Sequence, residues 1–230
     1  MKASLIISVY KNTNALRRIL HACLTQSERD FEIIISEDGQ YTPIANLVRE
    51  WHSVHPDVAL QHLTQLDKGW RKNRALNRAV VAARASWLIF IDGDCIPHRK
   101  FVEWHLRMAA PKNICAGARI KLGKHGLIGA THLEEAFFMP WINRRIHHLT
   151  GCNMSMAKTA LLDIGGFDEH YNTPSVGEDY DIEVRFLKKG YRLVSLRNKA
   201  VVYHLYHPEN WDRRTQDANM AYLKQKMSAE

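Results

Sequence analysis

The sequence predicts an α/β fold in which helices cover a mostly parallel mixed sheet. Short runs of β-branched residues alternate with helical patterns through the first half of the 230 residues, as in consecutive βαβ units. Several of these runs are continuously apolar, which is typical of strands buried on both faces of a sheet. No linker rich in Pro, Gly or Ser divides the chain, so we expect a single domain over residues 1–230.

In the first half, four strands and three helices are expected in alternation. The strands are short apolar runs at Leu5–Val9, Phe31–Ile35, Val58–Leu66 and Trp87–Ile91. The helices are predicted from apolar residues spaced three and four positions apart, at Ala15–Leu24, Ile44–Trp51 and Arg71–Ala83. Thr13 or Asn14 is the expected N-cap of the first helix, because short polar side chains accept the unpaired amides there.

The second half is expected to mix shorter strands and helices. The strands are predicted at Ile114–Leu122, Asn153–Ala157, Leu193–Leu196 and Ala200–His204. The helices are predicted at Phe101–Ala109, Lys158–Ile164 and Glu178–Lys189, and a polar helix closes the chain. Residues 123–131 carry Gly and His and predict a loop or lid.

Composition excludes several classes of protein. With 46% hydrophobic residues, the chain is too apolar for a disordered protein, and 12 Gly with 7 Pro are too few for collagen. Its four cysteines are scattered and form no CxxC pair, so we expect reduced thiols rather than a disulfide framework or a zinc site. The net charge of +8 suits nucleic acid, an anionic membrane or a phosphate-bearing substrate, and alone it does not choose among them.

The sequence predicts a protein without a membrane span. Its first apolar run is too short for the core of a signal peptide, and no stretch approaches the roughly 20 apolar residues of a spanning helix. We therefore expect a cytoplasmic protein, soluble or peripheral at the inner face of the membrane. The apolar residues 137–141 stand beside cations at 144–148. They fit either the rim of a site for a lipid-linked acceptor or a core edge with solvated basic residues.

Acidic residues follow the predicted strands, where open α/β sheets bind their ligands. Asp92-Gly93-Asp94 places two carboxylates on a tight turn, which suits a divalent cation that also holds a diphosphate. An ordinary Asp-Gly turn is the alternative. Glu178-Asp179 begins a helix, where capping is the alternative to catalysis. His204 or His207 could complete a metal site, although a lone histidine is more often a packed residue.

Familiar nucleotide-binding and nucleophile motifs are missing from the sequence. It contains no GxxxxGK[ST] loop, no GxGxxG after the first strand and no nucleophile elbow. Catalysis by metal and carboxylates is the chemistry that remains.

Taken in order, seven short motifs resemble the family 2 glycosyltransferases, which have the GT-A fold with a Rossmann-like sheet. They lie at residues 4–10, 31–39, 69–77, 90–97, 151–155, 165–169 and 177–181. Together they cover nearly the whole chain. The segment 165–208 is similar to the galactosyltransferase C-terminal module and to bacterial chondroitin-polymerase domains.

This resemblance implies a nucleotide-sugar half over residues 1–97 and an acceptor half over residues 98–230. Tyr10 and Asp38 would hold the uracil and ribose of a UDP-sugar, and Arg74 would lie near the base and phosphates. Asp92, followed by Gly93, would reach the ribose. Asp94 would bind Mn²⁺ or Mg²⁺ through the DxD motif.

The same resemblance assigns roles in the second half. Asp179 would be the general base, with Glu178 beside it. His207, in preference to His204, would be a metal ligand. Gly151 would start the strand that lines the acceptor side, where Trp211 could stack on a sugar, as could Trp70 or Trp141.

Some family features are absent. Ser8 stands where the first strand usually has proline, and the QxxRW motif of processive synthases is missing. The expected activity is metal-dependent, inverting transfer from a UDP-sugar to a glycan or lipid-linked hydroxyl, in bacterial surface polysaccharide synthesis.

Three alternative functions are less consistent with the sequence. A sugar-nucleotide nucleotidyltransferase would carry a Gly-rich, basic loop after the first strand, which the residues after Tyr10 do not form. A nucleic-acid-binding module has only the net charge in its favour, since the basic residues are dispersed, and we expect no nucleic-acid partner. A degenerate transferase would not be expected to keep both Asp94 and Asp179.

Overall fold

The structure is a computed structural model that describes residues 1–123, 148–174, 176–208 and 212–229. Most of the predicted loop at 123–131, the apolar residues 137–141 and the tryptophans Trp141 and Trp211 lie outside the described residues.

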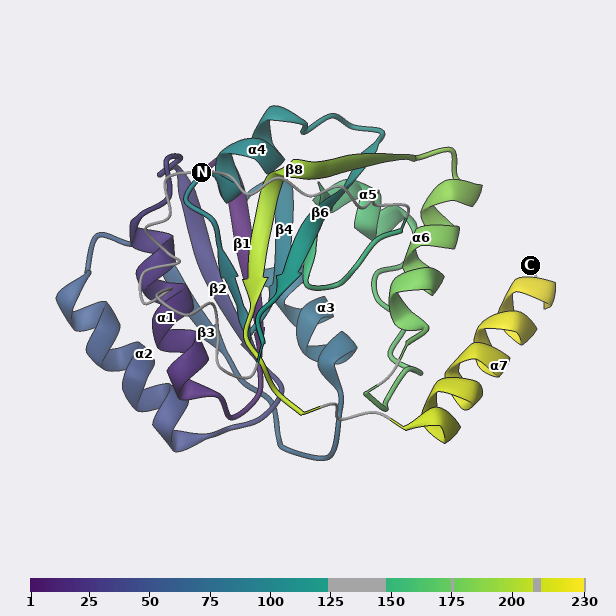
Figure 1. Ribbon diagram of the computed structural model, residues 1–230, viewed down its shortest axis with the longest axis horizontal. Coiled ribbons are helices and arrows are strands. Elements are labelled where there is room, and N and C mark those ends of the chain that lie inside the picture. Colours follow the sequence, from purple (N-terminus) through teal and green to yellow (C-terminus); the bar gives the residue numbers. More distant parts are fainter. Residues whose placement is uncertain (124–147, 175, 209–211, 230) are drawn as a thin grey trace.

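An eight-stranded mixed sheet forms the centre of the molecule (Figure 1). Its strands follow one another in the order β3 (Leu60–Leu63), β2 (Phe31–Glu37), β1 (Ala3–Val9), β4 (Trp87–Asp92), β7 (Asn153–Ala157), β6 (Asn113–Lys121), β8 (Arg192–His204) and β5 (Cys95–Pro97). The pairs β3–β2, β2–β1, β1–β4 and β6–β8 are parallel, whereas β7 and β5 run antiparallel to their neighbours. The prediction of a mostly parallel mixed α/β sheet is confirmed.

Helices cover both faces of this sheet. They are α1 (Thr13–Leu24), α2 (Thr42–Val54), α3 (Lys72–Ala82), α4 (Phe101–Arg107), α5 (Lys158–Asp163), α6 (Glu178–Lys188) and α7 (Arg213–Ala229). Side chains of α1, α2 and α4 share one apolar cluster with Leu5 and Ile7 of β1. Those of α3, α5 and α6 share a second cluster with Ile6. Alternate residues of one strand therefore face opposite layers, as expected for a strand buried on both sides.

Two local predictions were wrong. Asn12, rather than Thr13 or Asn14, caps α1, because its Oδ1 accepts a hydrogen bond of 3.1 Å from the amide of Ala15. The two short strands predicted at 193–196 and 200–204 are one strand, β8. Its register against β6 shifts between Gly117 and Ala118, so that residues 197–200 bulge out of the ladder.

Asn153 of β7, which lies on the other side of β6 from β8, holds this bulge in place. Its amide nitrogen donates to the carbonyl oxygens of Ala118 and Ala200 at 2.9 and 3.1 Å, and its Oδ1 lies 3.0 Å from Nε2 of His105. Asn153 and His105 are fully buried, and burial lowers the pKa of His105 to about 3. A neutral polar network therefore joins β6, β7, β8 and α4.

Gly117→Ala is expected to destabilise the fold, because its Cβ would lie 2.1 Å from Oδ1 of Asn153. Asn153 would have to move and break its buried hydrogen bonds, which costs about 2–4 kcal/mol in the free energy of unfolding. Urea unfolding of the wild type and of Gly117→Ala measures this loss of stability. Gly123→Ala is the matched control, since its Cβ would meet no atom of the described residues within 4 Å. Equal midpoints for the two variants would contradict this account of the bulge.

None of the helices in the described ranges combines the length and the apolar character needed to cross a bilayer.

Candidate active site

The Asp92-Gly93-Asp94 turn leaves the sheet at the carboxyl end of β4. A Cβ on Gly93 would lie 2.6 Å from the carbonyl oxygen of Ser8, so only glycine lets this turn approach the end of β1 so closely. Ser8 pairs with Asp92 across the β1–β4 ladder. The two carboxylates predicted to hold a cation and the ribose are thus fixed at the same sheet edge.

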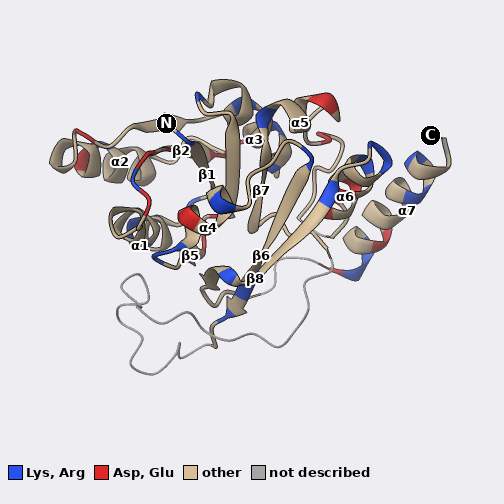
Figure 2. Cartoon of the chain, turned by 90° about the horizontal axis from the view of Figure 1, so that it is seen from above, with Lys and Arg blue, Asp and Glu red and all other residues tan. Residues whose placement is uncertain are grey.

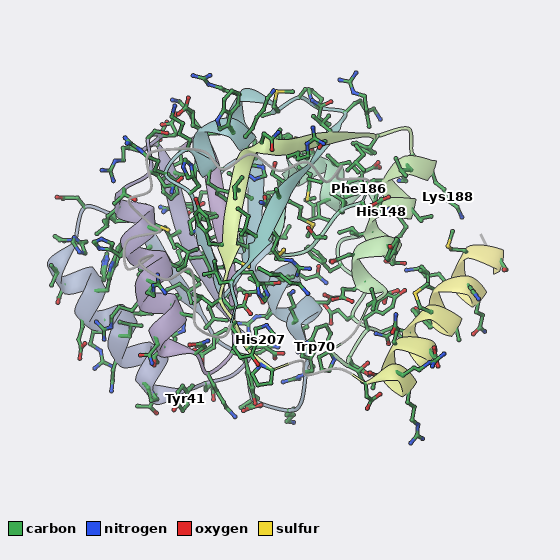
Figure 3. All side chains as sticks on the ribbon, in the orientation of Figure 1. Tyr41, Trp70, His148, Phe186, Lys188 and His207 are labelled. Atoms are coloured by element: carbon green, nitrogen blue, oxygen red, sulfur yellow. The ribbon has the colours of Figure 1, made fainter. Side chains whose placement is uncertain are left out.

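Two histidines converge on Asp94 from the end of β8. Nε2 of His204 lies 3.7 Å from Oδ1 of Asp94, and Nε2 of His207 lies 3.2 Å from its Oδ2. Pairing of Cys95 with His204 between β5 and β8 brings these distant segments together. Figure 3 shows His207 and Trp70 beyond this end of the sheet.

This cluster has the chemistry of a cation site. Asp94, Cys95 and His204 offer ligand atoms that all lie within 4.8 Å of one another. Burial lowers the pKa of His204 against the opposing charge of Asp94, so its ring is neutral near pH 7. A neutral imidazole and a carboxylate oxygen are ligands that transition-metal ions accept.

Lys72, the first residue of α3, is a site residue that sequence reasoning missed. Its Nζ lies 2.6 Å from Oδ1 of Asp92, and 17% of its side chain is exposed. Burial opposes its charge, but the carboxylates of Asp92, Glu178 and Asp179 outweigh this and raise its pKa. Lys72 therefore stays charged among three acidic groups.

Glu178 and Asp179 lie in the first turn of α6, facing Lys72. Burial and the neighbouring Asp179 raise the pKa of Glu178 to about 8, against the opposing charge of Lys72. Burial also raises the pKa of Asp179, while Lys72 and a hydrogen bond from the backbone of Gly151 oppose the rise. A raised pKa makes a carboxylate a stronger base near neutral pH.

Gly151 lies against both Asp179 and Lys72. A Cβ at this glycine would lie 2.9 Å from Oδ1 of Asp179 and 3.5 Å from Nζ of Lys72. The structure therefore brings Gly151, Lys72, Asp92 and Asp179 together in one cluster. Asp92 and Asp179 also interact electrostatically with Arg119 of β6, a second residue that the sequence did not indicate.

Asp38, predicted to contact the nucleotide, lies in the turn after β2. Its Oδ1 accepts from Nε2 of Gln65 at 2.7 Å, and its Oδ2 accepts from the amide of Arg71 at 2.5 Å. Tyr10 is 53% exposed, and its ring lies 3.8 Å from the position of a Cβ on Gly39 in the same turn. An exposed aromatic ring beside a fixed carboxylate suits the binding of a nucleobase. Arg74 is exposed on α3, and its role stays a prediction.

The sequence model of a family described as "Glycosyltransferase like family 2" matches residues 2–227. The chain belongs to this family. It is 25% identical over 267 residues to chondroitin synthase of Escherichia coli, a match that covers 97% of this chain and 38% of that protein. It is also 26% identical to pre-mycofactocin glycosyltransferase of Mycobacterium tuberculosis, covering 83% and 40% of the two chains. The family 2 chain thus spans about two-fifths of the length of these relatives.

Solved structures of similar shape support the GT-A fold of the family 2 chain. The mannosyltransferase PcManGT from Pyrobaculum calidifontis, in complex with GDP-Man and Mn²⁺, superposes with a TM-score of 0.70 at 16% identity and covers 100% of this chain and 64% of that chain. GalNAc-T7 with UDP, GalNAc and Mn²⁺ has a TM-score of 0.74 at 13% identity and covers 98% and 48%. At such identities the likeness establishes the fold, and the predicted GT-A fold is confirmed.

Proposed function

We propose that this chain catalyses metal-dependent, inverting transfer of a sugar from a UDP-sugar to a hydroxyl of a glycan or lipid-linked acceptor. The observation that carries the proposal is the pairing of two different acidic clusters at one sheet edge. Asp94 forms ion pairs with His204 and His207. Lys72 forms an ion pair with Asp92 and also interacts electrostatically with Asp179. One cluster suits a cation on a diphosphate and the other suits a general base. Synthesis of a bacterial surface polysaccharide is the proposed setting.

Asp94, with His204 or His207, would hold Mn²⁺ or Mg²⁺. The two ring nitrogens lie 3.7 and 3.2 Å from the carboxylate oxygens, so small movements bring all three groups onto one ion. A bound divalent cation supplies Lewis-acid stabilisation of the charge on the departing UDP. Solved neighbours of this fold contain Mn²⁺, which supports the proposal.

Asp179 is the proposed general base. Its carboxylate takes the proton from the acceptor hydroxyl while that oxygen attacks the anomeric carbon from the face opposite UDP, and the configuration inverts. Lys72 balances the negative charge of Asp92, Glu178 and Asp179. Because this lowers the pKa of Asp179, more of its carboxylate is ionised and able to accept a proton. Gly151 leaves room for the carboxylate at the acceptor side.

Lys72→Met is expected to lower kcat for transfer at least about tenfold near pH 7. Without the ammonium the pKa of Asp179 rises, so the acid limb of the pH–rate profile moves to higher pH. Lys100→Met, at an exposed lysine before α4, is the matched control. If Lys72→Met had the wild-type pH–rate profile, Lys72 would not control the ionisation of Asp179.

Donor binding offers a test that needs no acceptor. UDP with Mn²⁺ is expected to raise the melting temperature, whereas GDP with Mn²⁺ and a single-stranded oligonucleotide are not. If GDP with Mn²⁺ raised the melting temperature and UDP with Mn²⁺ did not, guanine would replace uracil as the nucleobase in this proposal. A shift with the oligonucleotide alone would favour nucleic-acid binding, although Figure 2 shows Lys and Arg spread over many of the described elements.

Peripheral contact with the cytoplasmic membrane is a further part of the proposal. It rests on the apolar and basic residues 137–148, of which the structure describes only His148.

A further inference from the structure

Helix α7 packs beside the first turn of α6, the turn that carries Glu178 and Asp179 (Figure 1). Among the α7 side chains that the structure describes, Asn219 and Leu223 are the buried ones. Tyr222 stacks on His170 with ring centroids 4.3 Å apart. With so little apolar surface buried, polar and aromatic contacts attach most of this helix.

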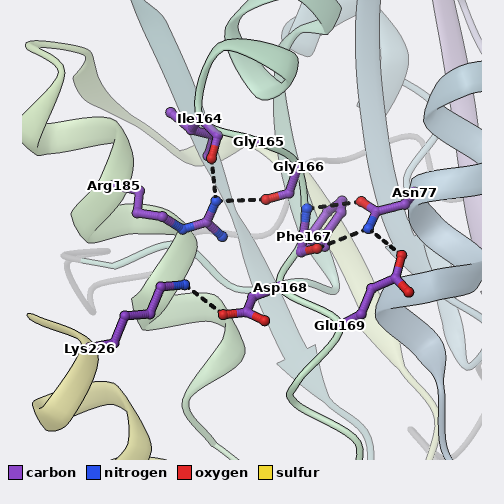
Figure 4. A pocket seen from close by; sticks show the side chains of 9 residues that line it. All are labelled: Asn77, Ile164, Gly165, Gly166, Phe167, Asp168, Glu169, Arg185 and Lys226. Carbon is purple, nitrogen blue, oxygen red and sulfur yellow. Dashed lines mark hydrogen bonds and ion pairs between the residues drawn. The ribbon is translucent and has the colours of Figure 1, made fainter.

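Lys226 of α7 forms two ion pairs at once. Its Nζ lies 2.6 Å from Oδ2 of Asp168, a contact drawn in Figure 4, and 2.7 Å from Oδ1 of Asp181. Asp181 belongs to the first turn of α6, two residues after Asp179, and its amide donates to the carbonyl oxygen of Gly177. Lys226 therefore contacts the turn of α6 that carries Asp179, the proposed general base.

Arg185 holds the other side of Asp181. Its Nε and Nη2 donate to Oδ2 of Asp181 at 2.8 and 2.5 Å, and its Nη1 donates to the carbonyl oxygens of Ile164 and Gly166 at 2.7 Å. Arg185, Lys226 and Asp168 line a pocket of about 440 Å³ (Figure 4). The cations of Lys226 and Arg185 thus balance the carboxylates of Asp168 and Asp181.

This balance matters because Asp181 is nearly out of solvent, with 2% of its side chain exposed. Breaking a buried ion pair by removing one partner is costly, since the remaining charge stays unpaired. Without the Lys226 ammonium, the carboxylates of Asp168 and Asp181 would repel one another. A displacement of Asp181 that relieved this repulsion would move the first turn of α6, to which Asp181 belongs.

We propose that Lys226 is a positioning residue for sugar transfer, which holds the first turn of α6 so that Asp179 faces the acceptor. The inference rests on the proposed function. Lys226 acts through Asp181 and touches none of the proposed reacting groups. A misplacement of about 1 Å can cost a hundredfold in rate, so a small shift of this turn would suffice.

Kinetics of Lys226→Met test the inference. Its kcat is expected to fall about tenfold or more, while KM for the donor stays within about twofold, because the nucleotide site lies on other elements. Lys226→Arg keeps the charge and should recover most of kcat. Lys224→Met, at an exposed lysine of the same helix, should match the wild type. A Lys226→Met variant that behaves like Lys224→Met overturns the inference, as does a rise in KM with kcat unchanged.

Hydrogen exchange of the amides at residues 180–182 gives a readout that does not depend on activity. Exchange there is expected to be faster in Lys226→Met than in Lys224→Met, because the first turn loses its anchor. Equal exchange overturns the inference whether or not sugar transfer is found. If the wild type transfers no sugar at all, the proposed function fails, and the exchange data still report whether Lys226 holds the turn.

Discussion

Asp179→Asn is expected to lower the rate of sugar transfer by about 10²–10⁴-fold, the usual contribution of a general base. The amide has nearly the size of the carboxylate, so its packing against Gly151 should persist. It cannot take the proton of the acceptor hydroxyl. Because the Asp94 cluster is untouched, UDP with Mn²⁺ should still raise the melting temperature by the wild-type amount.

Initial rates of transfer and melting curves, measured on the same preparations, check this pair of expectations. Asp57→Asn, in an exposed turn before β3, is the matched control and should be fully active. Wild-type transfer rates in Asp179→Asn would remove Asp179 from the mechanism. Loss of both transfer and UDP binding would mean that the substitution disturbs the donor site.

Asp94→Ala is expected to abolish metal-dependent donor binding and, with it, measurable transfer. Asp94 forms ion pairs with both His204 and His207, so its loss removes the carboxylate that both imidazoles contact. Removal of one anionic oxygen ligand weakens a divalent-cation site strongly. Titration of Mn²⁺ into protein with UDP, followed by calorimetry, measures the effect.

Controls for Asp94→Ala come from the same chain. Asp217→Ala, at an exposed position of α7, should bind Mn²⁺ and UDP as the wild type does. Parallel titrations of His204→Ala and His207→Ala identify the imidazole that holds the ion, for which the sequence favoured His207. Unchanged Mn²⁺ affinity in Asp94→Ala would refute the assignment of the metal site.

The sequence predicted the parts of this site that follow from local pattern. Asp92 and Asp94 stand directly after an apolar strand, and Glu178 and Asp179 stand at the start of an amphipathic helix. Parallel strands bring such ends to one edge of a sheet. The location of the site at this edge of the sheet could therefore be inferred from the sequence alone.

The parts that were missed depend on contacts between distant segments. Lys72 looks like an ordinary helical lysine, and only the packing of α3 on the sheet places it at Asp92. The bulge in β8 was missed because Asn153, on another strand, stabilises it. The N-cap of α1 was misplaced because Asn12, Thr13 and Asn14 are all suitable caps, and only the backbone conformation chooses among them.

Release of UDP from UDP-sugars by the wild-type protein, with and without Mn²⁺, is the most direct test of the central claim. The proposal predicts slow hydrolysis of at least one UDP-sugar that stops on addition of EDTA, returns with excess Mn²⁺ and is absent in Asp94→Ala. GDP-sugars should be hydrolysed poorly. Hydrolysis that continues in EDTA and in Asp94→Ala, or no turnover of any UDP-sugar, would contradict a metal-dependent UDP-sugar transferase.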